Sequence, residues 1–169
     1  FKLLVVALFL HDIAKCEKGD HSKNGSKIAK RICIRFGLNS HETKLVSWLV
    51  LHHLLLSNTA FRYDLSDGNI IKNCAKIIKT PEKLRLLLIL TVCDIKAVGP
   101  EVWNDWKGAL IHELYVKVMN ELKHDNSSKT DEDVDFRTKN KLRHYLVEQN
   151  WEEEKALFYI SKFNSDYWK

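Results

Sequence analysis

The sequence predicts an all-α protein, a helical bundle of about seven to eight helices. The 169 residues contain only two prolines and six glycines, which suits helices joined by short turns. Apolar side chains also recur at helical spacing along most of the chain. Because 45% of the residues are hydrophobic, the chain can bury one sizeable core, and we expect a single domain over residues 1–169.

Apolar periodicity predicts the first two helices over residues 1–16 and 22–36. Gly37 follows the second helix and is expected to be its C-cap, because glycine readily adopts the left-handed backbone conformation found there. The short polar stretch 17–20 contains Gly19 and is predicted to be a loop that turns the chain back.

A third helix is predicted to run to about Ser57, with Asn39 or Ser40 as its N-cap. The stretch 61–68 has the composition of a loop. Two more helices are then expected, the second of which opens with a proline and is stopped by a Gly-Pro pair: residues 69–79 and 81–98.

The last part of the chain is expected to hold one more long helix, over residues 102–123, which completes a motif-bearing core of residues 1–123. Residues 124–136 are rich in Asn, Ser and Asp and are predicted to form a polar surface loop. Residues 137–169 are expected to carry two short C-terminal helices, over 137–149 and 151–163.

The net charge of +5 and the pI near 9.0 would permit contact with an acidic partner. The longest like-charged clusters are nevertheless acidic, 131–133 and 152–154, so no nucleic-acid partner is predicted. The apolar run 1–10 is far shorter than the roughly 20 residues that span a bilayer, so we expect neither a membrane anchor nor a signal peptide. Because the chain begins without Met, we expect it to be a domain of a longer protein.

Four cysteines stand far apart, without a C-x-x-C pair, among apolar neighbours: Cys16, Cys33, Cys74 and Cys93. This pattern predicts small buried thiols of a reducing compartment and therefore a cytoplasmic protein, rather than a zinc knuckle.

The strongest chemical signal is the adjacent pair His11 and Asp12 near the end of an apolar helix. Removing a carboxylate from water is costly unless it is fully hydrogen-bonded or binds a metal, so a divalent cation is the economical explanation. For an isolated pair, a helix end whose polar residues reach solvent is the alternative.

Further ligand-type side chains are His21, His52, His53 and Asp94. Asp94 interrupts a very apolar run, where a carboxylate should be paired, metal-bound or at an exposed helix end. Singly, each histidine could be an ordinary loop or core residue. Together the set suits Mg²⁺ or Mn²⁺, with Fe²⁺ or Zn²⁺ as alternatives, and such an ion activates water and neutralises phosphate oxygens.

Lys15 lies one turn from His11 and Asp12 and is the candidate catalytic cation, with a surface ion pair as the alternative. Arg62 and Lys107 are candidate phosphate contacts, although such residues more often only hold a loop.

An HD doublet followed by two histidine motifs and a distant aspartate, all on helices, resembles the HD phosphohydrolase superfamily. More narrowly, the sequence resembles the uridylyl-removing domains of bifunctional uridylyltransferases that act on PII signalling proteins. The resemblance covers nearly all of the chain, weakens after Lys123 and is carried by LFLHDIAK, GDHS, ET..V.WLV.HHLLLS, RYDLSD, LT..DI.AVGP and VWNDWK.

The resemblance implies an HD-domain fold and metal-dependent hydrolysis of the phosphodiester that links UMP to a tyrosine of PII. A mechanism of this kind would use Asp12 to anchor the metal and Lys15, one turn away, as the catalytic cation. Trp103 and Trp106 could stack on uracil, although core packing is the alternative. His52 is an additional candidate ligand. The metal ligands that the resemblance implies are His11, Asp12, His21, His53 and Asp94.

The same resemblance implies a nucleotidyltransferase domain before this region and ACT domains after it, through which glutamine acts as an effector. The superfamily usually supplies one more histidine from a helix before the doublet, and that ligand would lie upstream of residue 1. Two rival interpretations stay open: an HD phosphohydrolase of free nucleotides such as a dNTP or an alarmone, and a non-catalytic helical regulatory module.

Overall fold

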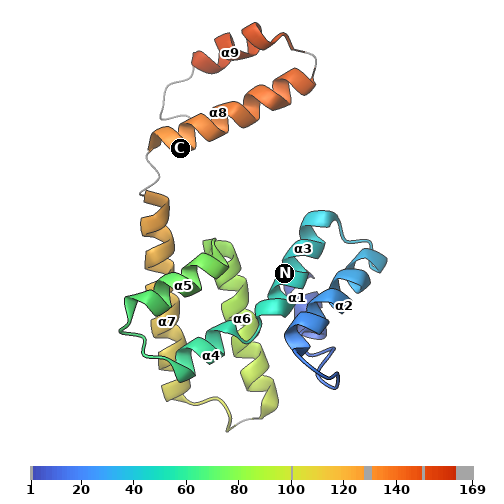
Figure 1. Ribbon diagram of the computed structural model, residues 1–169, viewed down its shortest axis with the longest axis vertical. Helices are drawn as coiled ribbons and strands as arrows, with labels where there is room; N and C mark the ends of the chain where they lie inside the picture. Colours follow the sequence, from blue (N-terminus) through green and yellow to red (C-terminus); the bar gives the residue numbers. More distant parts are fainter. Residues whose placement is uncertain (1, 100, 128–130, 150, 163–169) are drawn as a thin grey trace. The chain divides into compact units, whose positions relative to one another are not determined.

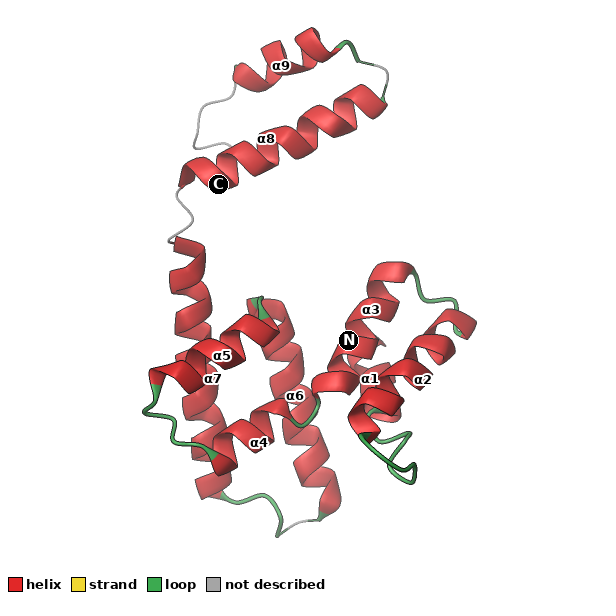
Figure 2. Ribbon diagram, viewed as in Figure 1, coloured by secondary structure: helices red, strands yellow, loops and turns green. Residues whose placement is uncertain are grey.

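The computed structural model describes residues 2–99, 101–127, 131–149 and 151–162 (Figure 1). Within these residues the regular secondary structure is entirely helical, which confirms the predicted all-α class (Figure 2). The chain divides into two compact units, Phe1–Leu122 and Lys123–Lys169, and the single domain expected over residues 1–169 stays a prediction. The boundary lies one residue before the predicted end of the motif-bearing core.

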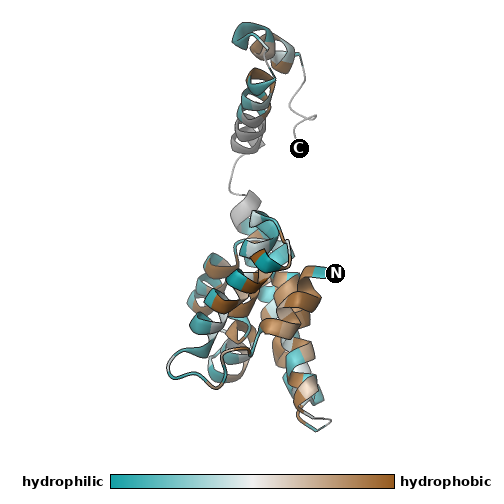
Figure 3. Cartoon of the chain, turned by 90° about the vertical axis from the view of Figure 1, so that its right-hand side faces the viewer, coloured by the Kyte–Doolittle hydropathy of each residue, from teal (hydrophilic) through white to brown (hydrophobic). Residues whose placement is uncertain are grey.

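The first helix, α1 (Lys2–Leu10), is shorter than predicted. After Leu10 the chain continues in tight turns through residue 16, in which Ile13 N–H donates to Leu10 O at 3.2 Å and Lys15 N–H donates to Asp12 O at 2.9 Å. α1 buries Leu4, Ala7 and Leu10, yet it is apolar on every side, and Figure 3 colours the helix beside the N-terminus mostly brown. The tight turns present His11 and Asp12 just beyond the end of this apolar helix.

Helices α2 (His21–Arg35) and α3 (Ser40–His52) pack against each other, and α3 also packs on α1. Asn39 caps α3 in a reciprocal arrangement: its side chain accepts from Glu42 N–H at 2.9 Å, and the Glu42 carboxylate accepts from Asn39 N–H at 2.9 Å. The predicted cap is therefore confirmed at Asn39.

The predicted third helix is interrupted at His53 and Leu54, after which α4 (Leu55–Arg62) begins. The expectation of one continuous helix to Ser57 was therefore wrong, and so was the start of the loop 61–68, because Phe61 and Arg62 are helical. This interruption places His53 outside the regular helix, where its side chain turns toward the end of α1.

Helices α5 (Gly68–Ile78) and α6 (Pro81–Val98) follow within a residue of the predicted bounds. Thr80 caps α6 by accepting from Lys83 N–H at 3.3 Å, and the proline occupies the first turn as expected. Leu84, Leu87 and Leu90 of α6 are fully buried and form the centre of the core. Since α6 packs on α1, α3 and α4, its C-terminal part brings Asp94 close to His11. His11 lies in the tight turns of residues 11–16, here called the HD turn.

The next helix, α7 (Asp105–Ser127), runs past the predicted end at residue 123, and α8 (Asp131–Glu148) begins before the predicted residue 137. The polar loop expected over residues 124–136 is therefore corrected: residues 124–127 and 131–136 are helical, and residues 128–130 lie outside the described part. Polar composition alone does not exclude a helix, because the helix propensities of polar residues differ from that of alanine by only a few tenths of a kcal/mol each.

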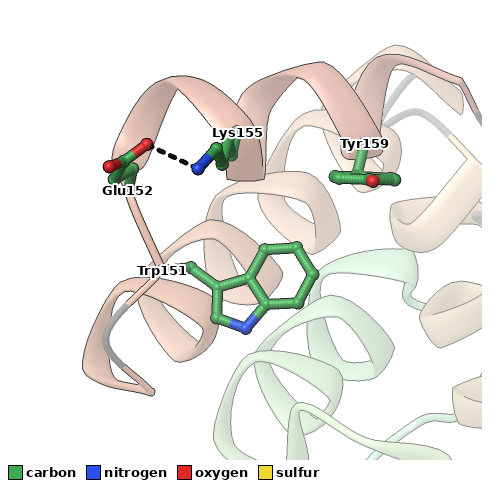
Figure 4. Close-up of a pocket in the computed structure, with 4 residues that line it drawn as sticks. All are labelled: Trp151, Glu152, Lys155 and Tyr159. Carbon is green, nitrogen blue, oxygen red and sulfur yellow. Dashed lines mark ion pairs between the residues drawn. The ribbon is translucent and has the colours of Figure 1, made fainter.

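The second unit contains α9 (Glu153–Ser161), which packs on α8, and an ion pair joins Arg143 to Glu153. A cavity of about 370 Å³ is lined by Trp151, Glu152, Lys155 and Tyr159, where Lys155 pairs with Glu152 at 3.0 Å (Figure 4). None of the predicted site residues belongs to this unit.

All four cysteines were predicted to be buried, and for two of them this was wrong. Cys33 and Cys74 lie in the core, whereas Cys16 and Cys93 are exposed. Among the helices that the structure describes, none combines the length and the apolar character required to cross a bilayer.

Candidate metal centre

Five side chains that are distant in the sequence meet in the first unit. His11 and Asp12 lie in the turn after α1, His21 is the first residue of α2, His53 follows the last residue of α3, and Asp94 lies on α6. The structure thus brings together the whole predicted ligand set, while the role of these residues as metal ligands stays a prediction.

His11 connects the two carboxylates. Its Nδ1 donates to Leu8 O at 2.7 Å, and its Nε2 lies 3.2 Å from Asp94 Oδ1 and 3.7 Å from Asp12 Oδ2. The contact between His11 and Asp94 spans 83 positions of the sequence. Because a backbone carbonyl fixes Nδ1 as the donor, the Nε2 atom faces the carboxylates.

Asp12, His21 and His53 form a group of three possible metal donors, with one atom from each lying within 4.8 Å of the others. The His53 ring centroid lies 5.5 Å from that of His21 and 5.3 Å from that of His11. Imidazole nitrogens and a carboxylate at this separation suit a shared divalent cation of the first transition row or Mg²⁺.

His53 provides a direct test of whether the site fits a cation. Its side chain is 1% exposed, its Nδ1 donates to Val50 O at 2.7 Å, and its Nε2 has no hydrogen-bond partner within the described residues. That Nε2 lies 3.8 Å from Asp12 Oδ1. Since a buried polar atom without a partner is costly, an electron-pair acceptor at this point would remove the cost.

The ionisation states also suit a cation. Burial lowers the pKa of His53 below its ordinary value, against an opposing effect of the hydrogen bond to Val50, so the ring is neutral near pH 7. Burial raises the pKa of Asp12, but the hydrogen bond from Lys15 and the neighbouring histidines outweigh it, and the pKa is lowered. A neutral imidazole and an ionised carboxylate are the forms that bind metals.

Lys15 lies beside this group. Its Nζ donates to Asp12 Oδ2 at 2.6 Å, and its side chain is 71% exposed. The hydrogen bond and charge of Asp12 raise the pKa of Lys15, so the ammonium stays protonated at the rim of the site.

Local sequence features explain how His21 reaches the site. Gly19 has a φ of 98°, a left-handed conformation that glycine adopts without strain, and it turns the chain back after the HD turn. Asp20 then caps α2 by accepting from Ser22 N–H and Lys23 N–H, both at 3.1 Å. The predicted site omitted Asp20, although an aspartate directly before a helix is a recognisable cap signal.

His52 does not join the five residues. Its ring lies 4.8 Å from the Trp48 ring, also on α3, and burial together with the nearby Lys83 lowers its pKa. Successive side chains along a helix point about 100° apart. The His52 side chain therefore faces Trp48, whereas the His53 side chain faces Asp12. The additional ligand considered from sequence is therefore not supported by the geometry.

The two candidate phosphate contacts are placed differently. Lys107 Nζ donates to Val102 O at 2.7 Å and lies 6.0 Å from the Phe61 ring centroid, so it holds the chain before α7. Arg62 is an exposed residue at the end of α4. Their roles as phosphate contacts stay predictions.

The two candidate stacking residues also differ from each other. Trp103 packs against the core, as the alternative interpretation held, with Lys96 Nζ 5.4 Å from its ring centroid. Trp106 is 63% exposed and lies nearly parallel to Phe61, with 6.4 Å between ring centroids.

Comparison with known proteins identifies the family of this chain. Residues 2–94 match the HD domain family, and this interval contains all five converging side chains and ends at Asp94. The chain belongs to the HD domain family. Its relatives include the bifunctional uridylyltransferase/uridylyl-removing enzymes of Zymomonas mobilis subsp. mobilis, Azospirillum brasilense and Gluconobacter oxydans.

These relatives are 58%, 51% and 53% identical over 113, 114 and 117 residues, which cover 67%, 68% and 69% of the chain. The matched part of this HD-domain chain spans only 12% of the length of each of these proteins. No solved structure matches the chain significantly.

Proposed function

We propose that this HD domain is a metal-dependent phosphodiesterase that removes UMP from uridylylated PII protein. The observation that carries the proposal is the convergence of His11, Asp12, His21, His53 and Asp94, in which the Nε2 of His53 has no hydrogen-bond partner among the described residues. The names of the relatives support the uridylyl-removing activity, and the sequence resemblance supports PII as the protein substrate.

The five side chains would hold one or two divalent ions, Mg²⁺ or Mn²⁺ in the first place and Fe²⁺ or Zn²⁺ as alternatives. When bound, such an ion supplies a Lewis acid that activates water and offsets charge on phosphate oxygens. Asp12, which lies between His11 and His53, is the central carboxylate of this set.

The remaining chemistry falls to the residues at the rim. Water adds to phosphorus, the bond from phosphorus to the tyrosine oxygen breaks, and the products are UMP and a free tyrosine hydroxyl. The Lys15 ammonium, held 2.6 Å from Asp12, orients that carboxylate and places a positive charge beside the developing negative charge on phosphate.

In the longer protein, a nucleotidyltransferase domain would precede this unit and ACT domains that bind glutamine would follow residues 123–169. The proposed location is the cytoplasm, where PII and its uridylylation would be found.

The experiment measures UMP release from uridylylated PII by the full-length protein with Mn²⁺ or Mg²⁺. Asp12→Asn and Asp94→Asn should abolish release, because each removes a charged oxygen donor from the centre. Glu113→Gln is the matched control, since it changes a carboxylate to an amide on α7, where Glu113 pairs with Lys117 at 2.7 Å. Release that is unaffected by Asp12→Asn would refute the proposal.

A free nucleotide is the rival substrate. Efficient hydrolysis of a dNTP or an alarmone, together with failure to release UMP from PII, would contradict the substrate assignment and leave the metal centre intact.

A further inference from the structure

Gly25 occupies an unusual place in α2. It is buried in the interior of a helix, where glycine is among the least favourable residues. A Cβ atom built there would lie 3.3 Å from Val50 Cγ1, 3.7 Å from His11 O and 3.8 Å from Ala14 Cβ. The backbone of α2 therefore lies directly against α3 and against the HD turn.

The same contact is fixed by a hydrogen bond at the next residue. The Ser26 hydroxyl donates to Ser47 O at 2.8 Å and joins α2 to α3. Gly25 lies four residues after His21, which places both on the same face of α2. The close approach thus occurs one turn from the imidazole that contacts His53.

Val50 connects this contact to the metal centre. Its side chain is fully buried against the position of Gly25, and its carbonyl oxygen accepts the hydrogen bond from His53 Nδ1 at 2.7 Å. A shift of α2 away from Val50 would therefore move His21 relative to His53.

We propose that Gly25 is a positioning residue that sets the separation of His21 from His53 by allowing α2 to approach Val50. The inference rests on the proposed metal centre and adds a residue that touches neither ion nor substrate. A methyl group at position 25 would widen the spacing by a few tenths of an ångström, because its 3.3 Å neighbour is itself packed in the core.

The test is Gly25→Ala in the full-length protein, with Mn²⁺ affinity measured by calorimetry and unfolding in urea measured without metal. We expect Mn²⁺ affinity to fall by about 10-fold or more, the range for residues that support ligands. The urea midpoint without metal should change little, since the better helix propensity of alanine opposes the packing strain. Gly68→Ala is the matched control, because a Cβ at this helical glycine of α5 meets nothing within 4 Å.

A size exchange makes the test specific. Val50→Ala removes the Cγ1 atom that the new methyl group meets, so Gly25→Ala/Val50→Ala should bind Mn²⁺ more tightly than Gly25→Ala alone. Failure of this rescue, or equal Mn²⁺ affinity of Gly25→Ala and the natural protein, would overturn the role of Gly25 while the metal centre stands. A natural protein that binds no Mn²⁺ would instead refute the metal centre itself.

Discussion

His53 and Val50 are joined by a hydrogen bond of 2.7 Å from the imidazole Nδ1 to the carbonyl oxygen of the last full turn of α3. This bond settles which nitrogen carries the proton. It also directs toward Asp12 the Nε2 atom, for which the described part of the chain offers no hydrogen-bond partner. The ring is therefore oriented as a donor of an electron pair before any ion binds.

The first prediction concerns the two neighbouring histidines. His53→Gln should lower Mn²⁺ affinity by about 100-fold or more, because it removes a donor that the backbone holds in place. His52→Gln is the matched control and should leave the affinity unchanged, since the His52 ring packs on Trp48. Calorimetric titration distinguishes the two, and equal losses would contradict the assignment of His53.

Lys15→Met tests the rim cation. Loss of the hydrogen bond should raise the pKa of Asp12, which carbon NMR of the carboxyl group can follow. In the natural protein this carboxylate contributes stability above the ordinary pKa of aspartate, and the contribution is lost as pH falls through the lowered pKa of the folded state. In Lys15→Met this contribution should be smaller and its loss should be complete at a higher pH, and UMP release should fall.

Lys155→Met is the control for this variant, because Lys155 forms an exposed ion pair at the same three-residue spacing with Glu152. Neither the Asp12 resonance nor UMP release should respond to it. An unchanged Asp12 pKa in Lys15→Met would show that the ion pair has no influence on the site.

The thiols should react in two groups. Cys16 and Cys93 are exposed and should be alkylated rapidly by iodoacetamide in the folded protein. Cys33 and Cys74 are buried, and burial raises the pKa of Cys74 to about 11, so both should react only after unfolding. Peptide mass mapping before and after denaturation measures this, and early labelling of Cys74 would contradict the described core.

Substitutions of the two capping residues Asn39 and Asp20 should affect Mn²⁺ affinity differently. Asn39→Ala should lower the free energy of unfolding by about 1 kcal/mol, because it removes the capping box of α3. Mn²⁺ affinity should not change, since Asn39 and His53 lie at opposite ends of a helix of 13 residues.

Asp20→Ala, by contrast, should weaken Mn²⁺ binding, because Asp20 caps the helix that begins at His21.

Sequence reasoning placed α6 correctly because both of its ends carry strong local signals, a proline in the first turn and a glycine after the last. It missed the interruption at His53 and Leu54 because no proline or glycine marks it and the apolar pattern continues through it. The interruption accompanies tertiary contacts: Thr91 of α6 donates to the His53 carbonyl at 3.5 Å, and the His53 ring faces Asp12.

The convergence of the donor residues, and the preference for His53 over His52, could be expected from the motifs shared with the HD superfamily. Local sequence alone does not separate the two histidines, because adjacent residues of one type carry the same local signal, and the structure distinguishes them by the direction of each side chain. The polar stretch around residues 124–136 lacked any local feature that would reveal its helices, because it carries no apolar periodicity and is rich in Asn, Ser and Asp.

The distance in sequence between His11 and Asp94 has a consequence for synthesis. A ribosome adds Asp94 83 residues after His11, the residue that it contacts in the folded unit. Until α6 has emerged and packed, a nascent chain can offer an ion only part of the donor set. An ion would therefore meet all five donor residues only after α6 has packed on α1, and a chain truncated before residue 94 would lack one carboxylate of the set.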